Sequence, residues 1–196
     1  MLSILAGMMI ALGAIIYLSA GGPVGAIMFS MGLLTILTFG FNLFTGKAGL
    51  IATKEFGMKQ LLGVWIGNFI GTFIVAVLLV YTPNGVLLAE KASQIVSVRN
   101  NNNFATNIIY GIFCGTLMYM AVTTFKKTNG NPIYAMMPVA MFILSGFNHC
   151  VADMFYIHLG SDNFNDYLTL IPTTIGNFIG CNTIPASILI KERVER

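Results

Sequence analysis

Long apolar stretches separated by short polar connections dominate the chain. Six of them approach the roughly 20 residues that a membrane-spanning helix needs. They fall at about residues 2–19, 24–39, 61–81, 104–125, 132–157 and 167–190. The second continues as a glycine-interrupted piece to residue 52, and the fifth is interrupted around residues 146–149. This pattern predicts an all-α membrane protein of six spans whose second and fifth helices are broken.

A polar connection at residues 82–103 divides the spans into two groups of three, and we expect it to lie outside the membrane. Within it, residues 86–98 can form a short surface helix. Residues 191–196 form a charged tail. No shift in composition marks a second domain, so residues 1–196 are expected to form a single transmembrane domain.

The composition supports a chain embedded in lipid. Of its 196 residues, 56% are apolar and only 9% are charged, whereas about 25% are charged in average soluble domains. So few charges cannot cover a soluble monomer, and the high hydrophobicity excludes a disordered chain. The net charge of +3 is scattered, which argues against nucleic-acid binding. Cys114, Cys150 and Cys181 lie in apolar stretches and are expected to be buried thiols, and we expect no metal or cofactor.

The distribution of basic residues predicts the orientation. With six spans, both termini lie on the same side of the membrane. The connections and tail on that side carry seven basic residues: Lys54, Lys59, Lys126, Lys127, Lys191, Arg193 and Arg196. The opposite side carries two, Lys91 and Arg99. The positive-inside rule therefore predicts cytoplasmic termini, and we expect a bacterial inner (plasma) membrane.

An internal repeat relates the two groups of spans. The hexapeptide at Ile66–Gly71, IGNFIG, recurs 109 residues later at Ile175–Gly180. Gly40-Phe41-Asn42 recurs 106 residues later as Gly146-Phe147-Asn148. The two repeats are about residues 1–85 and 104–190, and three spans in each make the second copy enter the membrane in the opposite direction. Inverted repeats are typical of transporters and channels, whose substrate path runs at the repeat interface.

Both interruptions lie at matching positions of the repeat. Irregular backbone inside a membrane is tolerated where protein or a water-filled path satisfies it. Broken helix ends also leave N–H groups whose partial positive charge favours anions. We therefore expect an anion site between the two interruptions. The alternative is that the glycines only kink the helices for packing.

Ionisable residues inside a membrane are costly and are candidates for function. His149 lies at the second interruption, and a histidine has an ordinary pKa near 6.5, which suits proton exchange with a weak acid. Thr45 lies at the first interruption, where its hydroxyl can donate to an anion or to the histidine. The alternative for His149 is a hydrogen-bonded core histidine.

Two further charges lie in the interrupted segments. Asp153 follows Lys47 by the same 106 residues that relate Asn42 to Asn148. We therefore expect Lys47 and Asp153 to form an intramembrane ion pair, because pairing lowers the cost of two isolated charges. The alternative is that Lys47 reaches to the membrane interface.

These residues resemble the formate/nitrite transporter family. Leu43-Phe44-Thr45-Gly46 resembles the loop that interrupts the family's second helix. Residues 147–155, FNHCVADMF, resemble the element that interrupts its fifth helix, and residues 176–180, GNFIG, resemble a motif of its sixth. The resemblance covers essentially the whole chain.

The resemblance implies an aquaporin-like protomer in a homopentamer, and transport of small monovalent anions such as formate, nitrite, hydrosulfide or short monocarboxylates. By motif position, His149 is the central histidine and Thr45 its partner from the loop. Candidate residues are Asn42 and Asn148 for the substrate pathway, Phe41, Phe44 and Phe147 for constrictions, and Lys126 and Lys127 for the entrance.

The chain departs from the family pattern at three positions. Asn42 and Asn148 stand where acidic residues are common, and Asp153 stands where asparagine is common. We expect a channel-like transporter of a small anion, with or without proton coupling through His149, and no enzyme activity. Two alternatives are a channel for small neutral solutes and a membrane redox protein with His149 and His158 as haem ligands.

Overall fold

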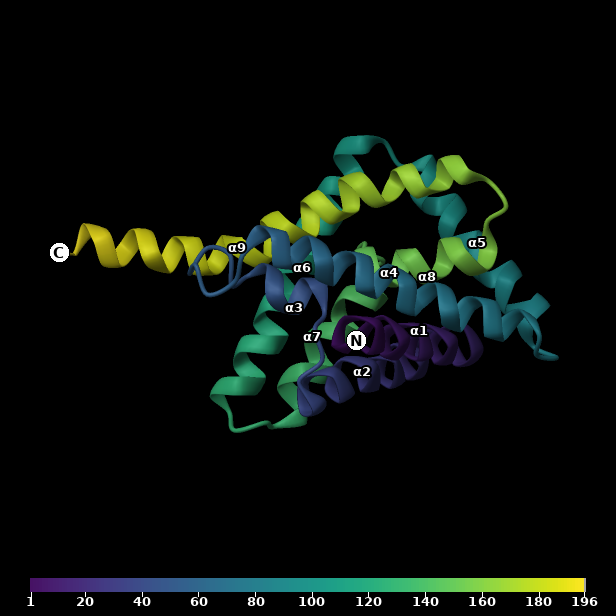
Figure 1. The fold of residues 1–196 in the computed structure, drawn as a ribbon, viewed down its shortest axis with the longest axis horizontal. Helices are drawn as coiled ribbons and strands as arrows, with labels where there is room; N and C mark the ends of the chain where they lie inside the picture. Colours follow the sequence, from purple (N-terminus) through teal and green to yellow (C-terminus); the bar gives the residue numbers. More distant parts are fainter. Residues whose placement is uncertain (196) are drawn as a thin grey trace.

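The computed structural model describes residues 1–195, and these residues contain helices and no strand. The elements are α1 (Leu2–Ala20), α2 (Gly22–Phe39), α3 (Phe44–Ala48), α4 (Met58–Val80), α5 (Gly85–Asn101), α6 (Phe104–Lys127), α7 (Pro132–Leu144), α8 (Cys150–Gly160), the 3-10 helix η1 (Phe164–Thr169) and α9 (Leu170–Val194). Arg196, the last residue of the predicted tail, lies outside the described residues. The final turns of α9 project beyond the other helices (Figure 1).

The chain is an integral membrane protein. The helices α1, α2, α4 and α6 are long and apolar enough to cross a membrane. Large side chains such as Leu62 and Leu78 on α4 are 60% and 62% exposed, as expected where lipid or another membrane protein covers a helix. The expected spans agree with the helices to within a few residues, and α7 with α8 make up the broken fifth segment.

Both predicted interruptions are present, and each begins at a glycine. Gly40 follows α2 with a φ of 69°, and Gly146 follows α7 with a φ of 70°. This left-handed conformation strains residues with a Cβ atom, so glycine is favoured there. The chain then runs extended for a few residues before the short helices α3 and α8 begin.

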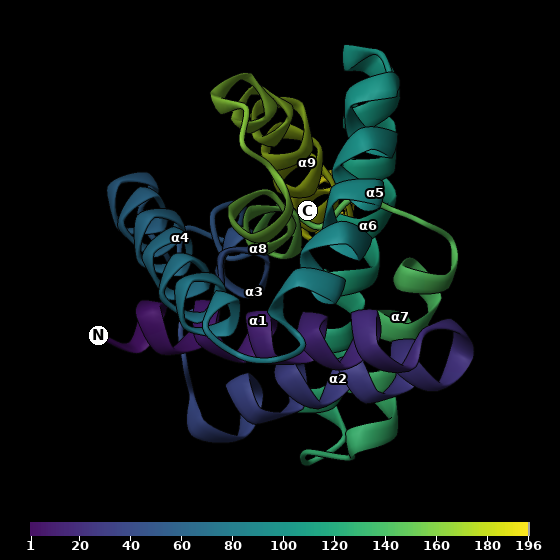
Figure 2. The same ribbon diagram turned by 90° about the vertical axis from the view of Figure 1, so that its right-hand side faces the viewer.

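The two halves of the chain pack in the same way. In the first half α1 packs against α2 and α4, and in the second half α6 packs against α7 and α9. The short helices join the two halves, because α3 and α8 each contact both α4 and α9. Figure 2 shows α3 and α8 near the middle of the molecule. The packing therefore follows the sequence repeat.

The asparagine of each repeated hexapeptide caps a short helix. Asn68 Oδ1 accepts the backbone N–H of Phe44, the first residue of α3, at 2.9 Å. Its Nδ2 donates to the carbonyl oxygens of Ser3 and Asn42. The Asn68 side chain thus links α4 to α1, to the interruption after α2 and to α3.

Asn177 does the same in the second half. Its Oδ1 accepts the N–H of Cys150, the first residue of α8, at 2.8 Å. Its Nδ2 donates to the carbonyls of Gly111 and Asn148. Nearby, a Cβ atom at Gly115 would overlap the Asn177 backbone, so the small residue permits this close contact between α6 and α9.

The connection at residues 82–103 is more than a surface segment. Its helix, α5, extends over Gly85–Asn101 and packs against α8 through buried residues that include Leu88, Ala92 and Val96. The Nζ of Lys91 donates to the carbonyl of Leu18 at the end of α1. The expectation of a short helix at 86–98 was correct in place, but it missed this packing against the interior.

We predict that Asn177→Ala destabilises the protein. The change leaves the Cys150 N–H and two carbonyl groups without their partner inside the membrane, and each such loss costs about 1–3 kcal/mol. The midpoint of thermal unfolding in detergent should fall by roughly 6 °C or more. The exposed Asn165→Ala is the matched control, and an equal effect of both changes would contradict the capping role.

Candidate functional site

His149 is fixed by the interruption between α7 and α8. It is 2% exposed, and its ring stacks on Phe142 with centroids 5.5 Å apart and an interplanar angle of 15°. Its Nδ1 accepts the backbone N–H of Ala152 at 3.2 Å. Because Nδ1 is an acceptor, this hydrogen bond assigns the proton of the neutral ring to Nε2.

Thr45 meets His149 from the other interruption. Thr45 on α3 is 1% exposed, and its Oγ1 lies 3.1 Å from His149 Nε2. With the proton on Nε2, the histidine donates and the hydroxyl accepts, so the hydroxyl hydrogen is free for another acceptor. The Thr45 carbonyl accepts the thiol of Cys181 on α9 at 3.3 Å. The expected contact between Thr45 and His149 is confirmed.

Cavities approach this pair from two sides. The first, here called the α5 cavity, has a volume of about 150 Å³, and its lining includes Arg99, Gly146, His149 and Asp153. Two others, here called the lysine cavities, have volumes of about 260 and 160 Å³. The larger is lined by residues that include Thr45, Lys126 and Lys127, and the smaller by residues that include Phe41, Lys47 and Lys126.

The helix α6 shows that these cavities extend toward opposite ends of the molecule. Asn107, in its first turn, contacts Arg99 of the α5 cavity, whereas Lys126 and Lys127 are in its last turn. A helix of 24 residues is about 36 Å long. The Thr45–His149 hydrogen bond therefore lies between cavities that open toward opposite ends of α6.

The expected ion pair between Lys47 and Asp153 is wrong. Asp153 Oδ1 instead lies 3.4 Å from Nε of Arg99, which belongs to α5. Lys47 Nζ lies 5.8 Å from the centre of the Phe56 ring and lines a lysine cavity. Lys47 lines a lysine cavity and Asp153 lines the α5 cavity, so the two charges lie on different sides of the Thr45–His149 pair.

Asn42 and Asn148 do not line the α5 or lysine cavities. The Asn148 side chain is buried and donates to Asn107 Oδ1 at 2.8 Å and to Thr173 Oγ1 at 3.5 Å. Asn42 contributes backbone hydrogen bonds to Leu2 and Asn68. The Asn148 side chain therefore belongs to the scaffold instead of the expected pathway, whereas Asn42 contacts its neighbours through its backbone.

The three phenylalanine candidates fall in different places. Phe41 lines a lysine cavity and Phe147 lines the α5 cavity, so each lies on one side of His149. Phe44 lines a separate apolar groove with Trp65 and Phe178. Of the three, only Phe41 and Phe147 line the lysine or α5 cavities.

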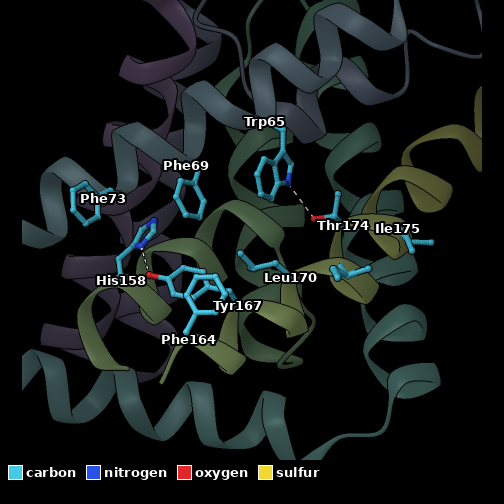
Figure 3. Close-up of a pocket in the computed structure, with 10 residues that line it drawn as sticks. Trp65, Phe69, Phe73, His158, Phe164, Tyr167, Leu170, Thr174 and Ile175 are labelled. Carbon is cyan, nitrogen blue, oxygen red and sulfur yellow. Dashed lines mark hydrogen bonds between the residues drawn. The ribbon is translucent and has the colours of Figure 1, made fainter. Parts of the chain in front are cut away.

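A larger aromatic groove of about 570 Å³ lies on the outer side of α4, α8 and α9 (Figure 3). Here His158 Nδ1 is 2.8 Å from the Tyr167 hydroxyl, and the Trp65 indole N–H donates to Thr174. His158 faces this groove while His149 lines the α5 cavity. The two histidines are thus not placed to hold one haem between them.

The broken ends are less open to anions than expected. At α8, Asn177 takes the N–H of Cys150 and His149 takes that of Ala152. At α3, Asn68 takes the N–H of Phe44. Side chains thus satisfy one of the first N–H groups of α3 and two of those of α8, and the side chains of Thr45 and His149 meet between the two helix starts.

Sequence reasoning missed the residues that fix the site from other helices. Asn182 on α9 donates to Ala48 at the end of α3 and accepts from the N–H of Ala52. Arg99 was counted only as a charge outside the membrane, yet it lines the α5 cavity. The only available signal for Asn182 was its place just after the sixth-span motif.

Comparison with known proteins settles the family. The family model described as formate/nitrite transporter matches residues 1–190. The chain belongs to the formate/nitrite transporter family. This is a family of transporters and channels rather than enzymes.

Relatives within the family support this assignment. The formate channel FocA of Escherichia coli (strain K12) is 27% identical over 230 aligned positions, covering 91% of this chain and 80% of that protein. The uncharacterized transporter YrhG of Bacillus subtilis (strain 168) is 30% identical and the match covers 83% of this chain and 68% of YrhG.

Solved structures show the same fold. A structure described as a pentameric formate channel with formate bound superposes with a TM-score of 0.82 at 23% identity, covering 98% of this chain and 95% of that chain. A second, described as an FNT family ion channel, has a TM-score of 0.77 at 20% identity and covers 93% and 84%.

We predict that Asp153 is coupled to Arg99 and not to Lys47. Removing one charge of a buried pair leaves the other uncompensated, so Arg99→Gln with Asp153→Asn should be more stable than the sum of the single changes implies. The effects of Lys47→Met and Asp153→Asn on stability should be additive in the double variant. Thermal unfolding of the single and double variants in detergent measures both cycles, and coupling in the Lys47 cycle alone would contradict the structure.

Proposed function

We propose that the protein conducts a small monovalent anion, with formate as the first candidate, through the path marked by Thr45 and His149. The observation that supports this proposal most directly is that cavities reach this hydrogen-bonded pair from two sides. The relatives named formate channels support formate, and nitrite, hydrosulfide and short monocarboxylates share its size and single charge.

The lysine cavities are the proposed entrance for anions on one side. Lys126 and Lys127 line the cavity that ends at Thr45, and Lys47 lines its neighbour. Positive charge in a confined cavity raises the local anion concentration. Phe41 and Phe147, one on each side of the pair, are the proposed constrictions.

At the pair, the anion meets the free hydroxyl hydrogen of Thr45 and the Nε2–H of His149. A bare charge is costly in an apolar constriction. We propose that His149 first takes a proton from a cavity, which releases Nδ1 from the Ala152 N–H and forms the imidazolium. The imidazolium then shares this proton with the anion or donates it, the ring returns to its neutral form, and the weak acid passes the second constriction.

The membrane arrangement is part of the proposal. Six spans, with α3 and α8 as half-helices, form two inverted repeats at about residues 1–85 and 104–190. Both termini lie in the cytoplasm of a bacterial inner membrane, as the lysines at one end favour. The protein assembles as a homopentamer, as does the pentameric formate channel of the same fold, and each protomer has its own path.

A channel for small neutral solutes is the second candidate. It rests on the small, largely apolar cavities on either side of the pair, which would also admit a molecule such as glycerol. The lysines favour an anion, because a neutral solute gains nothing from them.

Uptake into proteoliposomes tests the proposal. Formate, nitrite, hydrosulfide, acetate and glycerol are compared from pH 5 to pH 8, with empty liposomes as the control. We expect selective uptake of small anions that rises as the pH falls, because His149 must carry or receive a proton. Glycerol uptake without anion uptake would favour the neutral-solute channel instead.

We predict that Thr45→Val slows formate uptake by roughly tenfold or more. The change keeps the shape of the side chain but removes a hydroxyl that bonds His149 and offers its hydrogen to the anion. Thr45→Ser keeps the hydroxyl and is the matched control. Initial uptake rates should separate the two variants, and equal rates would remove Thr45 from the path.

A further inference from the structure

Arg99 places a guanidinium group in the α5 cavity. Its Nε lies 3.4 Å from Asp153 Oδ1, and its Nη1 donates to the carbonyl of Gly146 at 3.1 Å. The side chain is only 12% exposed. These contacts engage two of its five N–H groups, so three others are available to water or a ligand in the cavity.

The rest of Arg99 is held by a polar network. Its carbonyl accepts Nδ2 of Asn107 at 2.9 Å. Asn107 Oδ1 in turn accepts the amides of Asn148 and Asn102. The guanidinium is therefore presented from a fixed backbone at the junction of α5, α6 and the second interruption.

Among the described residues, the Asp153 carboxylate has only one of its two oxygens in a hydrogen bond. It is 3% exposed and lines the same cavity, one helical turn after His149. Its Oδ2 is buried and has no hydrogen-bond partner within residues 1–195. Buried carboxylate oxygens are almost always satisfied, so the pair is not a closed structural salt bridge.

We propose that Arg99 binds the permeating anion in the α5 cavity and that Asp153 is the internal counter-ion with which the anion competes. This inference rests on the proposed function and adds the anion site on the side away from the lysines. Formate carries the same carboxylate group as Asp153, so either can accept the N–H groups of the guanidinium.

The competition explains why an acid lies beside an anion path. Conduction requires a site that binds strongly enough to admit the ion and weakly enough to release it. Besides His149, Arg99 is the one basic residue in the lining of the α5 cavity, and alone it would hold an anion tightly. Asp153 weakens that binding, which permits release.

The test measures formate uptake rate against formate concentration at fixed pH for the wild type and four variants. Arg99→Gln should raise the half-saturating concentration by roughly tenfold or more, and Arg99→Lys should restore part of the affinity. Asp153→Asn, which keeps the shape, should lower the half-saturating concentration by several-fold and reduce the maximal rate. Lys91→Gln, which removes a charge from the same helix outside the cavity, is the control and should change neither.

The double variant Arg99→Gln/Asp153→Asn distinguishes anion binding by Arg99 from a purely structural role of the Arg99–Asp153 pair. Our proposal requires its half-saturating concentration to stay as high as that of Arg99→Gln. Recovery of wild-type affinity in the double variant, or a raised half-saturating concentration in Asp153→Asn, would overturn it. An inactive wild type would instead reject the proposed function, whereas an active wild type with unchanged variants rejects the Arg99 site alone.

Discussion

The hydrogen bonds from Asn68 and Asn177 to the two interruptions are the constraint on which the rest of the structure depends. A membrane interior offers no water to a free backbone group, so a helix can break there only if side chains supply the missing partners. Asn68 serves α3 and the segment before it, and Asn177 serves α8 in the same way. Helix α9 also holds α3, because Cys181 donates to the carbonyl of Thr45 and Asn182 to that of Ala48.

Once the interruptions are held, the position of Thr45 and His149 follows. Each lies at the start of a short helix, and the two helices bring them within one hydrogen bond of each other. His149 is also the N-cap of α8 through Ala152, so the same bond that fixes its helix fixes its ring and tautomer. The hydrogen bonds that satisfy the backbone at the interruptions thus also position the side chains of Thr45 and His149.

Much of the fold was predictable, because apolar length, glycine interruptions and the repeated hexapeptide are local signals. The contact of Thr45 with His149 was predictable because each lies at one of the two interruptions and matches a motif of the family. The partner of Asp153 was not, because repeat symmetry relates it to Lys47 while the contact comes from Arg99 on α5, which lies outside both repeats. The side chain of Asn148 was expected in the pathway because it lies at the interruption, and only the packing of α6 and α9 shows that it bonds Asn107 and Thr173 instead. Asn42 bonds its neighbours on α1 and α4 through its backbone.

The central claim is that an anion passes the Thr45–His149 pair with help from a proton at His149. The most direct measurement is the pH profile of formate uptake into proteoliposomes for the wild type and His149→Phe, with folding of both checked by size-exclusion chromatography. Our account predicts that the wild type takes up more formate as the pH falls from 8 to 5, and that the variant loses this proton-coupled flux. Uptake by His149→Phe that is unchanged and still depends on pH would contradict the account.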